Sequence, residues 1–285
     1  MAGKSLGEPE TEAFRRDGIL FPLRAVEPDA IAECLSTFES IEARYAGRFP
    51  PALNVKSHLL VPQLWDLVHA RRIVDPVEDL LGPDILCWAA SFFAKSPGDG
   101  QHVPWHQDGT YWGLTAPAAV TVWLAFTPST VENGCLRVVP GSHHGQLPHR
   151  DANRSGNMLP VGEELSVEVN EADAVDVVLA PGEMSIHHVL LAHASETNRS
   201  SGRRIGLAIR YIDGRVGQRD GRRNSATLVR GRDHGTFDLE RAPESAFDPR
   251  ALERQRQILR AFADNVSAAK TSESRQHPPG EPPSG

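Results

Sequence analysis

The feature that most constrains the fold is a series of short β-rich runs that begins at residue 85 and is punctuated by glycine and proline. Short strands at even spacing are typical of a sandwich or barrel, and not of a parallel sheet in which helices alternate with strands. We expect strands at residues 85–94, 119–127, 135–139, 176–179, 184–188 and 205–212.

The region before residue 85 has a helical pattern instead. Residues 27–45 carry apolar side chains at helical spacing behind Pro28, which suits a first turn. Residues 63–81 repeat the pattern, and Pro76 predicts a break into two helices. A short helix at 11–16 and a strand at 18–23 precede them, and a last helix is expected at 251–266.

The chain has 285 residues and neither an internal repeat nor a linker that would divide it. We therefore expect a single domain over residues 1–269. A chain of this size buries a core without disulfides or a structural metal, so any metal is free to be catalytic. Residues 270–285, rich in proline and glycine, predict a disordered tail.

Charge and composition exclude several classes of protein. The formal net charge of −7 argues against a nucleic-acid partner, and no apolar run is long enough to span a membrane. Three widely spaced cysteines and the lack of a signal peptide indicate a cytoplasmic protein, monomeric or homodimeric. The arginine-rich segment 213–235 is either a solvated face or a lid over an anionic ligand.

The sharpest chemical feature is the pair His106 and Asp108. Two residues apart on a strand, they present an imidazole and a carboxylate to the same side. Two histidines and one carboxylate on one face form the facial triad of iron(II) oxygenases, which leaves positions open for a cosubstrate and oxygen. The second histidine must come from downstream, where the candidates are His187, His188 and His193.

An arginine follows these histidines at a suitable spacing. Arg204 lies eleven residues after His193, so a hairpin that ends one strand at His193 and opens the next at Arg204 brings both to one cavity. A guanidinium pairs bidentately with the distal carboxylate of a dicarboxylate cosubstrate. Thr121 and Trp123 alternate on an intervening strand and offer a hydroxyl and an indole donor to the same carboxylate.

Three segments of the sequence resemble the phytanoyl-CoA dioxygenase family: WHQDGTYWG (105–113), TVWLAFTPSTVENGCLRVVPGSHHG (121–145), and PGEMSIHHVLLAHAS (181–195) with the later RRIGLAIRY (203–211). The resemblance covers residues 17–211 and is greatest to the small-molecule hydroxylases and related halogenases. It implies a mainly β fold with flanking helices, the double-stranded β-helix or cupin-like jelly-roll.

The resemblance also implies the site and its cofactors. By this resemblance His106, Asp108 and His193 are the iron(II) ligands, and Arg204 holds the C5 carboxylate of 2-oxoglutarate with help from Trp123 and Thr121. The implied cosubstrates are 2-oxoglutarate and O₂.

The implied reaction is hydroxylation of an unactivated carbon, with release of succinate and CO₂. Asp108 fills the position that the family's halogenases leave open for chloride, which favours hydroxylation over halogenation. Desaturation or ring formation in natural-product biosynthesis is the alternative. A halogenase and a non-catalytic metal-binding cupin are weaker alternatives.

The substrate is less constrained by the sequence. Asn54, Lys56 and His58 alternate in an expected extended segment and suggest a polar lip on the substrate pocket. A small polar metabolite such as an amino acid, a phosphonate or a natural-product intermediate fits such a lip. The further candidates for substrate contact are Lys95, Tyr111, Trp112 and Arg210.

Overall fold

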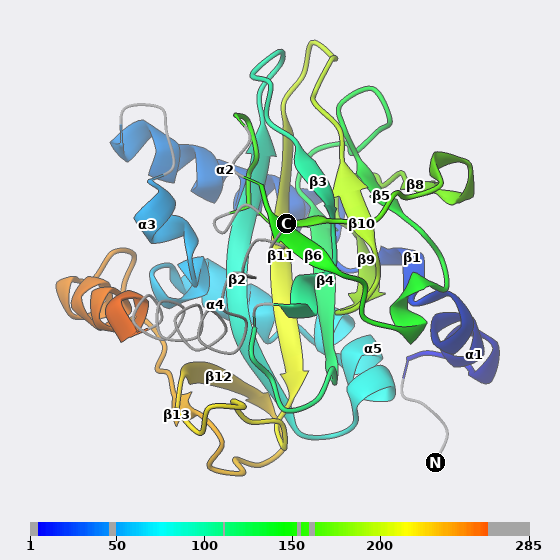
Figure 1. Ribbon diagram of the computed structural model, residues 1–285. Coiled ribbons are helices and arrows are strands. Elements are labelled where there is room, and N and C mark those ends of the chain that lie inside the picture. Colours follow the sequence, from blue (N-terminus) through cyan, green and yellow to red (C-terminus); the bar gives the residue numbers. More distant parts are fainter. Residues whose placement is uncertain (1–4, 46–49, 111, 153–154, 160–162, 262–285) are drawn as a thin grey trace, which may run out of the picture.

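Two sheets form the centre of the protein in this computed structural model, which describes residues 5–45, 50–110, 112–152, 155–159 and 163–261 (Figure 1). Within these residues, the larger sheet has the strand order β1-β9-β4-β11-β2-β12-β13 and the smaller sheet has the order β3-β10-β5-β8. All strand pairs of the two sheets are antiparallel except β12 with β13. This is the flanked jelly-roll that the sequence predicts.

The larger sheet consists of β1 (Ile19–Arg24), β9 (Glu183–His188), β4 (Ala119–Ala125), β11 (Arg204–Asp213), β2 (Ile85–Lys95), β12 (Ser225–Arg230) and β13 (Asp238–Leu239). The smaller sheet consists of β3 (Val103–His106), β10 (His193–Ser195), β5 (Leu136–Val138) and β8 (Val175–Val177). A separate pair joins β6 (His149–Asp151) and β7 (Glu163–Leu165). Each of the six runs predicted from residue 85 onward overlaps a strand.

The α-helices are α1 (Glu8–Asp17), α2 (Pro28–Arg44), α3 (Pro51–Asn54), α4 (Pro62–Val68) and α5 (Arg71–Leu81), and residues 249–261 form another. Short 3₁₀ turns are η1 (Ser57–Leu59), η2 (Asp108–Thr110), η3 (Ser142–His144) and η4 (Glu171–Asp173). The apolar faces of α2, α4 and α5 pack on one face of the larger sheet, where Phe38, Leu64 and Ile73 join one buried cluster with strand residues. The helices therefore leave the other face of that sheet to the smaller sheet.

A second apolar cluster lies between the sheets. Trp123 and Ala208 of the larger sheet pack there with Leu136, Val138 and Val177 of the smaller one. This cluster fixes how closely the two sheets approach, and the candidate site lies beside it.

The predicted helix break at Pro76 is wrong in position. The break between α4 and α5 falls at His69 and Ala70, where Ala70 adopts extended backbone angles. Pro76 lies in the middle of α5 and is buried against the core. Because proline has no N–H to donate to the carbonyl of Arg72, α5 continues through Pro76 with one backbone hydrogen bond fewer.

No helix in the described part of the chain is long and apolar enough to cross a bilayer. The predicted tail, 270–285, and the end of the predicted C-terminal helix lie outside the described residues. The assignment of residues 1–269 to one domain stays a prediction.

Candidate functional site

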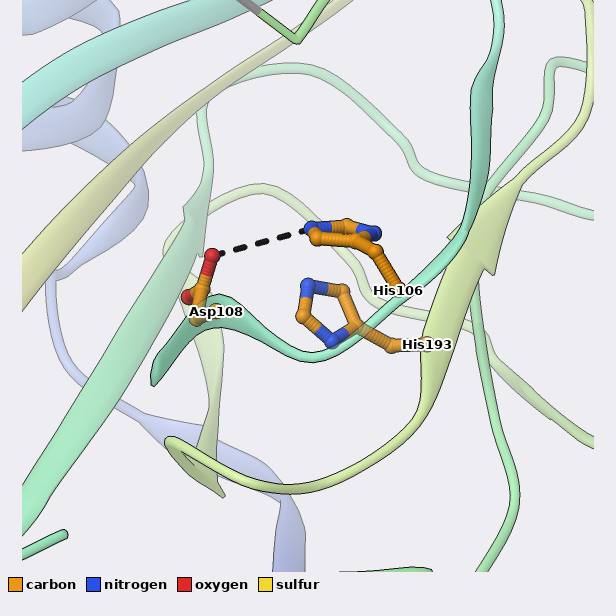
Figure 2. A group of neighbouring side chains, drawn as sticks. All are labelled: His106, Asp108 and His193. Carbon is orange, nitrogen blue, oxygen red and sulfur yellow. Dashed lines mark ion pairs between the residues drawn. The ribbon is translucent and has the colours of Figure 1, made fainter. Parts of the chain in front are cut away.

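His106, Asp108 and His193 lie together in the interior, as Figure 2 shows. One ligand atom from each lies within 4.8 Å of the others, and all three residues are buried. His106 ends β3 and His193 opens β10, and the two are direct cross-strand partners. Residues 87 positions apart in the sequence are thus neighbours on the smaller sheet.

Asp108 reaches this group by a different route from the one the sequence predicts. The strand ends at His106, and Asp108 stands in the 3₁₀ turn η2, with its Oδ1 3.6 Å from His106 Nε2. Buried Gln107 holds the turn, because its amide donates to Leu190 O at 2.6 Å and accepts from Leu147 N at 2.8 Å. The turn, and not strand alternation, places the carboxylate beside the imidazoles.

Hydrogen bonds orient each of the three side chains. His106 Nδ1 donates to Pro104 O, and His193 Nδ1 donates to Leu191 O, each at 2.9 Å. Because a carbonyl only accepts, Nδ1 carries a proton in both rings, and in the neutral imidazole Nε2 is then the nitrogen that can bind a metal. Thr121 Oγ1 donates to Asp108 Oδ2 at 2.8 Å.

The protonation states suit metal binding. Burial, with His106 and His187 close by, holds the pKa of His193 well below its ordinary value. Burial alone would raise the pKa of Asp108, but His106 and His193 hold it well below its ordinary value. Two neutral imidazoles and one carboxylate are the donor set of the facial triad that binds iron(II).

One cavity contains these three side chains and a cationic end. It lies between the two sheets, and its lining comes from both: Phe93, Val103, His106, Asp108, Thr121, Trp123, Leu136, Leu159, His187, His193, Ser195, Arg204, Ala208 and Arg210.

Arg204 is at the cationic end and is 2% exposed. Its Nη1 donates to Gly134 O at 2.9 Å and to Ser195 Oγ at 3.2 Å, whereas its buried Nε has no partner among the described residues. Lys95, its cross-strand partner, donates to Ser195 O at 3.0 Å. Burial lowers the pKa of Arg204 to about 10, and burial with Arg204 nearby lowers that of Lys95 to about 7. An orphaned donor beside two cations fits a carboxylate.

The predicted hairpin between His193 and Arg204 is wrong, although both residues reach the cavity. His193 lies in the smaller sheet and Arg204 opens β11 of the larger one, so residues 196–203 cross from one sheet to the other. Thr121, expected beside Arg204, instead holds Asp108 and lies opposite Arg210 on the neighbouring strand. Trp123 does lie at Arg204, 5.1 Å from its guanidinium carbon.

Gly206 makes room for Trp123. A Cβ at this position would lie 2.2 Å from the indole Cζ2. We expect Gly206→Ala to lower the free energy of unfolding by ~1–3 kcal/mol, the cost of overpacking a core. Urea denaturation would measure it, with Gly202→Ala as the matched control because no atom lies within 4 Å of a Cβ there. Equal losses in both variants would show that Trp123 does not need this space.

Two polar lining residues were not assigned to the site from the sequence, where His187 was only an alternative to His193. His187 Nε2 lies 4.0 Å from Asp108 Oδ2, and neither of its ring nitrogens has a hydrogen-bond partner within the described residues. Ser195 stands two residues after His193 on β10, so strand alternation could have identified it. His188, the neighbouring candidate, does not line the cavity and accepts a hydrogen bond from Leu190 N.

The remaining substrate candidates divide into three cases. Arg210 lines the cavity, and Trp112 lies against its guanidinium. Lys95 is buried behind the cavity with Ser195. Tyr111 lies outside the described residues.

Asn54, Lys56 and His58 do not line this cavity. The expected extended segment is instead helical at α3 and η1. Other residues of the protein bind the Asn54 amide, the Lys56 ammonium group and His58 Nε2, whereas buried His58 Nδ1 has no partner among the described residues. Asn54 pairs with the Phe92 backbone in both directions, at 2.7 and 2.8 Å. Lys56 Nζ lies 2.6 Å from Glu240 Oε1, and His58 Nε2 lies 3.5 Å from Glu240 Oε2. These residues stabilise the fold on the far side of β2.

Removing the charge of Glu240 tests that assignment. We expect Glu240→Gln to lower the free energy of unfolding by ~3–5 kcal/mol at neutral pH, because Lys56 would be left buried without its partner. Burial alone would raise the pKa of Glu240, but Lys56 and His58 lower it from 4.5 to about 2. A lowered folded-state pKa stabilises above the unfolded value, so the stabilisation is complete above 4.5 and is lost as the pH falls towards 2.

Urea denaturation of the wild type and the variant at several pH values measures this effect. The difference between the two proteins should shrink below pH 4.5, the ordinary value for Glu240. Exposed Glu253 provides the control, since Glu253→Gln should change stability by less than ~0.5 kcal/mol. A difference between wild type and Glu240→Gln that is unchanged by pH would contradict the ion pair.

The arginine-rich segment 213–235 contacts acidic side chains, and its role as a solvated face or a lid stays a prediction. Several of its arginines pair with acids, including Arg215 with Asp213, Arg223 with Asp238, and Arg230 with Asp75. None of the described arginines in this segment lines the cavity of the triad. The alternative interpretation as a lid has no support in these contacts.

Known proteins are similar to this chain in sequence. A family model described as phytanoyl-CoA dioxygenase (PhyH) matches residues 14–206. A phytanoyl-CoA dioxygenase domain-containing protein 1 homolog from Dictyostelium discoideum is 28% identical over 160 residues, covering 55% of this chain and 57% of that protein. The chain spans about half the length of the curated relatives it matches.

Solved structures match over nearly their full length. The non-heme monooxygenase ThoJ, in its apo form, is 37% identical with a TM-score of 0.81, and the match covers 92% of this chain and 99% of ThoJ. CytC3 with Fe(II) and alpha-ketoglutarate is 25% identical with a TM-score of 0.64, and the match covers 87% of this chain and 97% of CytC3.

Proposed function

The chain belongs to the phytanoyl-CoA dioxygenase family, and from this premise we propose that it is an Fe(II)- and 2-oxoglutarate-dependent oxygenase that hydroxylates an unactivated carbon of a small polar metabolite. The observation that carries the proposal is one buried cavity that contains both the His106–Asp108–His193 group and the cationic end at Arg204. A metal site alone would not need a buried guanidinium with an unpaired donor.

The donor set fits iron(II), and the cationic end fits a dicarboxylate. His106, His193 and Asp108 would hold the metal through two unprotonated nitrogens and one carboxylate oxygen. Arg204 would pair with the C5 carboxylate of 2-oxoglutarate, and Lys95 adds positive charge behind it. Such a centre supplies O₂-dependent oxidation of a C–H bond coupled to the conversion of 2-oxoglutarate into succinate and CO₂.

The protein's own part is to position these groups and to exclude water. Thr121 fixes the carboxylate of Asp108, and the backbone carbonyls of Pro104 and Leu191 fix the two imidazoles. Phe93, Val103, Leu136 and Leu159 form the apolar part of the lining. Apolar walls keep water away from a reactive centre and hold the target carbon in place.

The outcome is proposed to be hydroxylation, because Asp108 would occupy the metal coordination position that chloride would need. ThoJ, with which the chain shares the most identity among the structures compared above, is a non-heme monooxygenase, which agrees with insertion of oxygen. The amino acids, phosphonates and natural-product intermediates remain the proposed substrate classes.

The test is substrate-stimulated turnover of 2-oxoglutarate. Fractionated metabolite pools are added to the enzyme with iron(II), 2-oxoglutarate and air, and succinate release is followed together with product mass. Hydroxylation adds one oxygen atom to the substrate, whereas desaturation removes two hydrogens, and halogenation in high chloride adds chlorine. A dominant chlorinated product would overturn the hydroxylase assignment, and failure to form succinate in any fraction would contradict the oxygenase itself.

A further inference from the structure

Arg210 is the second guanidinium of the cavity, and the proposed chemistry does not use it. It stands on β11 opposite Thr121, the residue that holds Asp108, and so lies next to the metal ligands. Within the described residues no carboxylate or carbonyl accepts a hydrogen bond from its guanidinium. Arg210 is half-buried, and those of its N–H donors that face the cavity can donate to a ligand.

Aromatic rings hold this guanidinium in place without using its donors. Its central carbon lies 5.9 Å from the ring of Phe93 and 6.0 Å from the ring of Trp112. Trp112 in turn lies 4.6 Å from the ring of Trp88. An arginine that is held between aromatic faces keeps its N–H edge free for a planar, anionic partner.

Arg204 and Arg210 address different parts of the same cavity. Both are on β11 and are separated by six residues, or roughly 20 Å of extended strand. Arg204 is committed to Gly134, Ser195 and the face of Trp123, at the end where Lys95 lies. The guanidinium of Arg204 is therefore available for the cosubstrate, and the guanidinium of Arg210 is available for another ligand.

The net charge of the cavity also favours an anionic ligand. Asp108 is the one acidic side chain among the described lining residues, while Arg204 and Arg210 are cationic. With iron(II) and the 2-oxoglutarate dianion bound, these groups leave one positive charge without a partner. A charge in a cavity that is partly shielded from water is stabilised by an opposite charge close to it.

We propose that Arg210 binds an anionic group of the substrate, a carboxylate or a phosphonate, and thereby restricts this enzyme to small acids. The inference rests on the proposed function and narrows its substrate class. Arg210 is a specificity-determining residue in this view, since its planar N–H edge selects planar or tetrahedral oxyanions over neutral groups.

The experiment uses anaerobic enzyme loaded with iron(II) and 2-oxoglutarate, whose visible charge-transfer band reports the cosubstrate complex. Methylphosphonate and its neutral match, dimethyl methylphosphonate, are titrated while the change in this band is followed. We expect the wild type to bind the acid at least about thirtyfold more tightly than the ester. Arg210→Met should bind the acid no better than the ester, and Arg210→Lys should fall between them.

The charge-transfer band distinguishes failure of the Arg210 proposal from failure of the proposed function. Arg210→Met should keep it unchanged, and loss of the band in that variant would overturn the inference by assigning Arg210 to the cosubstrate. Equal binding of acid and ester by the wild type would overturn it as well. Absence of the band in the wild-type protein would instead contradict the proposed function, and this inference with it.

Discussion

His106→Ala is expected to abolish stoichiometric iron binding and, with it, turnover of 2-oxoglutarate. The variant leaves two of the three ligand side chains, and His193 loses the imidazole opposite it on the paired strand. Loss of residues that merely orient a ligand already weakens metal binding ~10–100-fold, so loss of a ligand should cost more than this. Iron content after anaerobic loading and dialysis measures the effect, and His193→Ala should behave alike.

A histidine outside the cavity supplies the control. His144 is exposed, contacts the ring of His143 and does not line the cavity. His144→Ala should therefore retain one iron per chain and full activity. If His106→Ala and His193→Ala both kept one iron per chain, the metal would have to bind elsewhere.

The second large effect is expected for Arg204→Met. Removal of this buried cation leaves the distal carboxylate of 2-oxoglutarate without its bidentate partner, which typically costs ~2–5 kcal/mol. The apparent KM for 2-oxoglutarate should then rise roughly thirtyfold or more, while iron content stays at one per chain. Arg204→Lys should recover part of the affinity, because it keeps the charge but loses the planar fork.

Comparison with Arg210 makes the prediction specific. If Arg210→Met raised the KM for 2-oxoglutarate and Arg204→Met did not, the roles of the two arginines would be exchanged. The burial of Arg204 and its contact with Trp123 favour the assignment made here.

The fold and the three metal-binding candidates were predictable because their signals are local or ordered along the chain. Runs of apolar residues predict strands directly. The spacing of His106 and Asp108 indicates a metal site, even though the strand ends at His106 and Asp108 lies in the next turn. The choice of the downstream histidine needed more information, since His187, His188 and His193 all offer the same imidazole side chain. Pairing of β3 with β10 distinguishes His193, and the family's motif order was the only sequence feature that indicated it.

The residues that were misassigned depend on partners far away in the sequence. Lys56 and His58 look like free polar groups until Glu240 is known, and 184 residues separate Lys56 from that carboxylate. The role of Thr121 could not be predicted for the same reason, because nothing in its own strand indicates that Asp108 lies beside it. Pairs of this kind follow from tertiary packing, which periodicity and spacing do not encode.

The division of the cavity between two sheets has a thermodynamic consequence. The two imidazoles belong to the smaller sheet, while the hydroxyl that fixes Asp108 and the guanidinium of Arg204 belong to the larger one. A cofactor that contacts both sheets binds only when the two sheets are packed together. Cofactor binding therefore stabilises the packing of the sheets, and the packing in turn raises the affinity for the cofactor. We therefore expect substitutions in the apolar cluster between the sheets, at Leu136 or Val177, to lower the affinity for iron and 2-oxoglutarate as well as the stability of the fold.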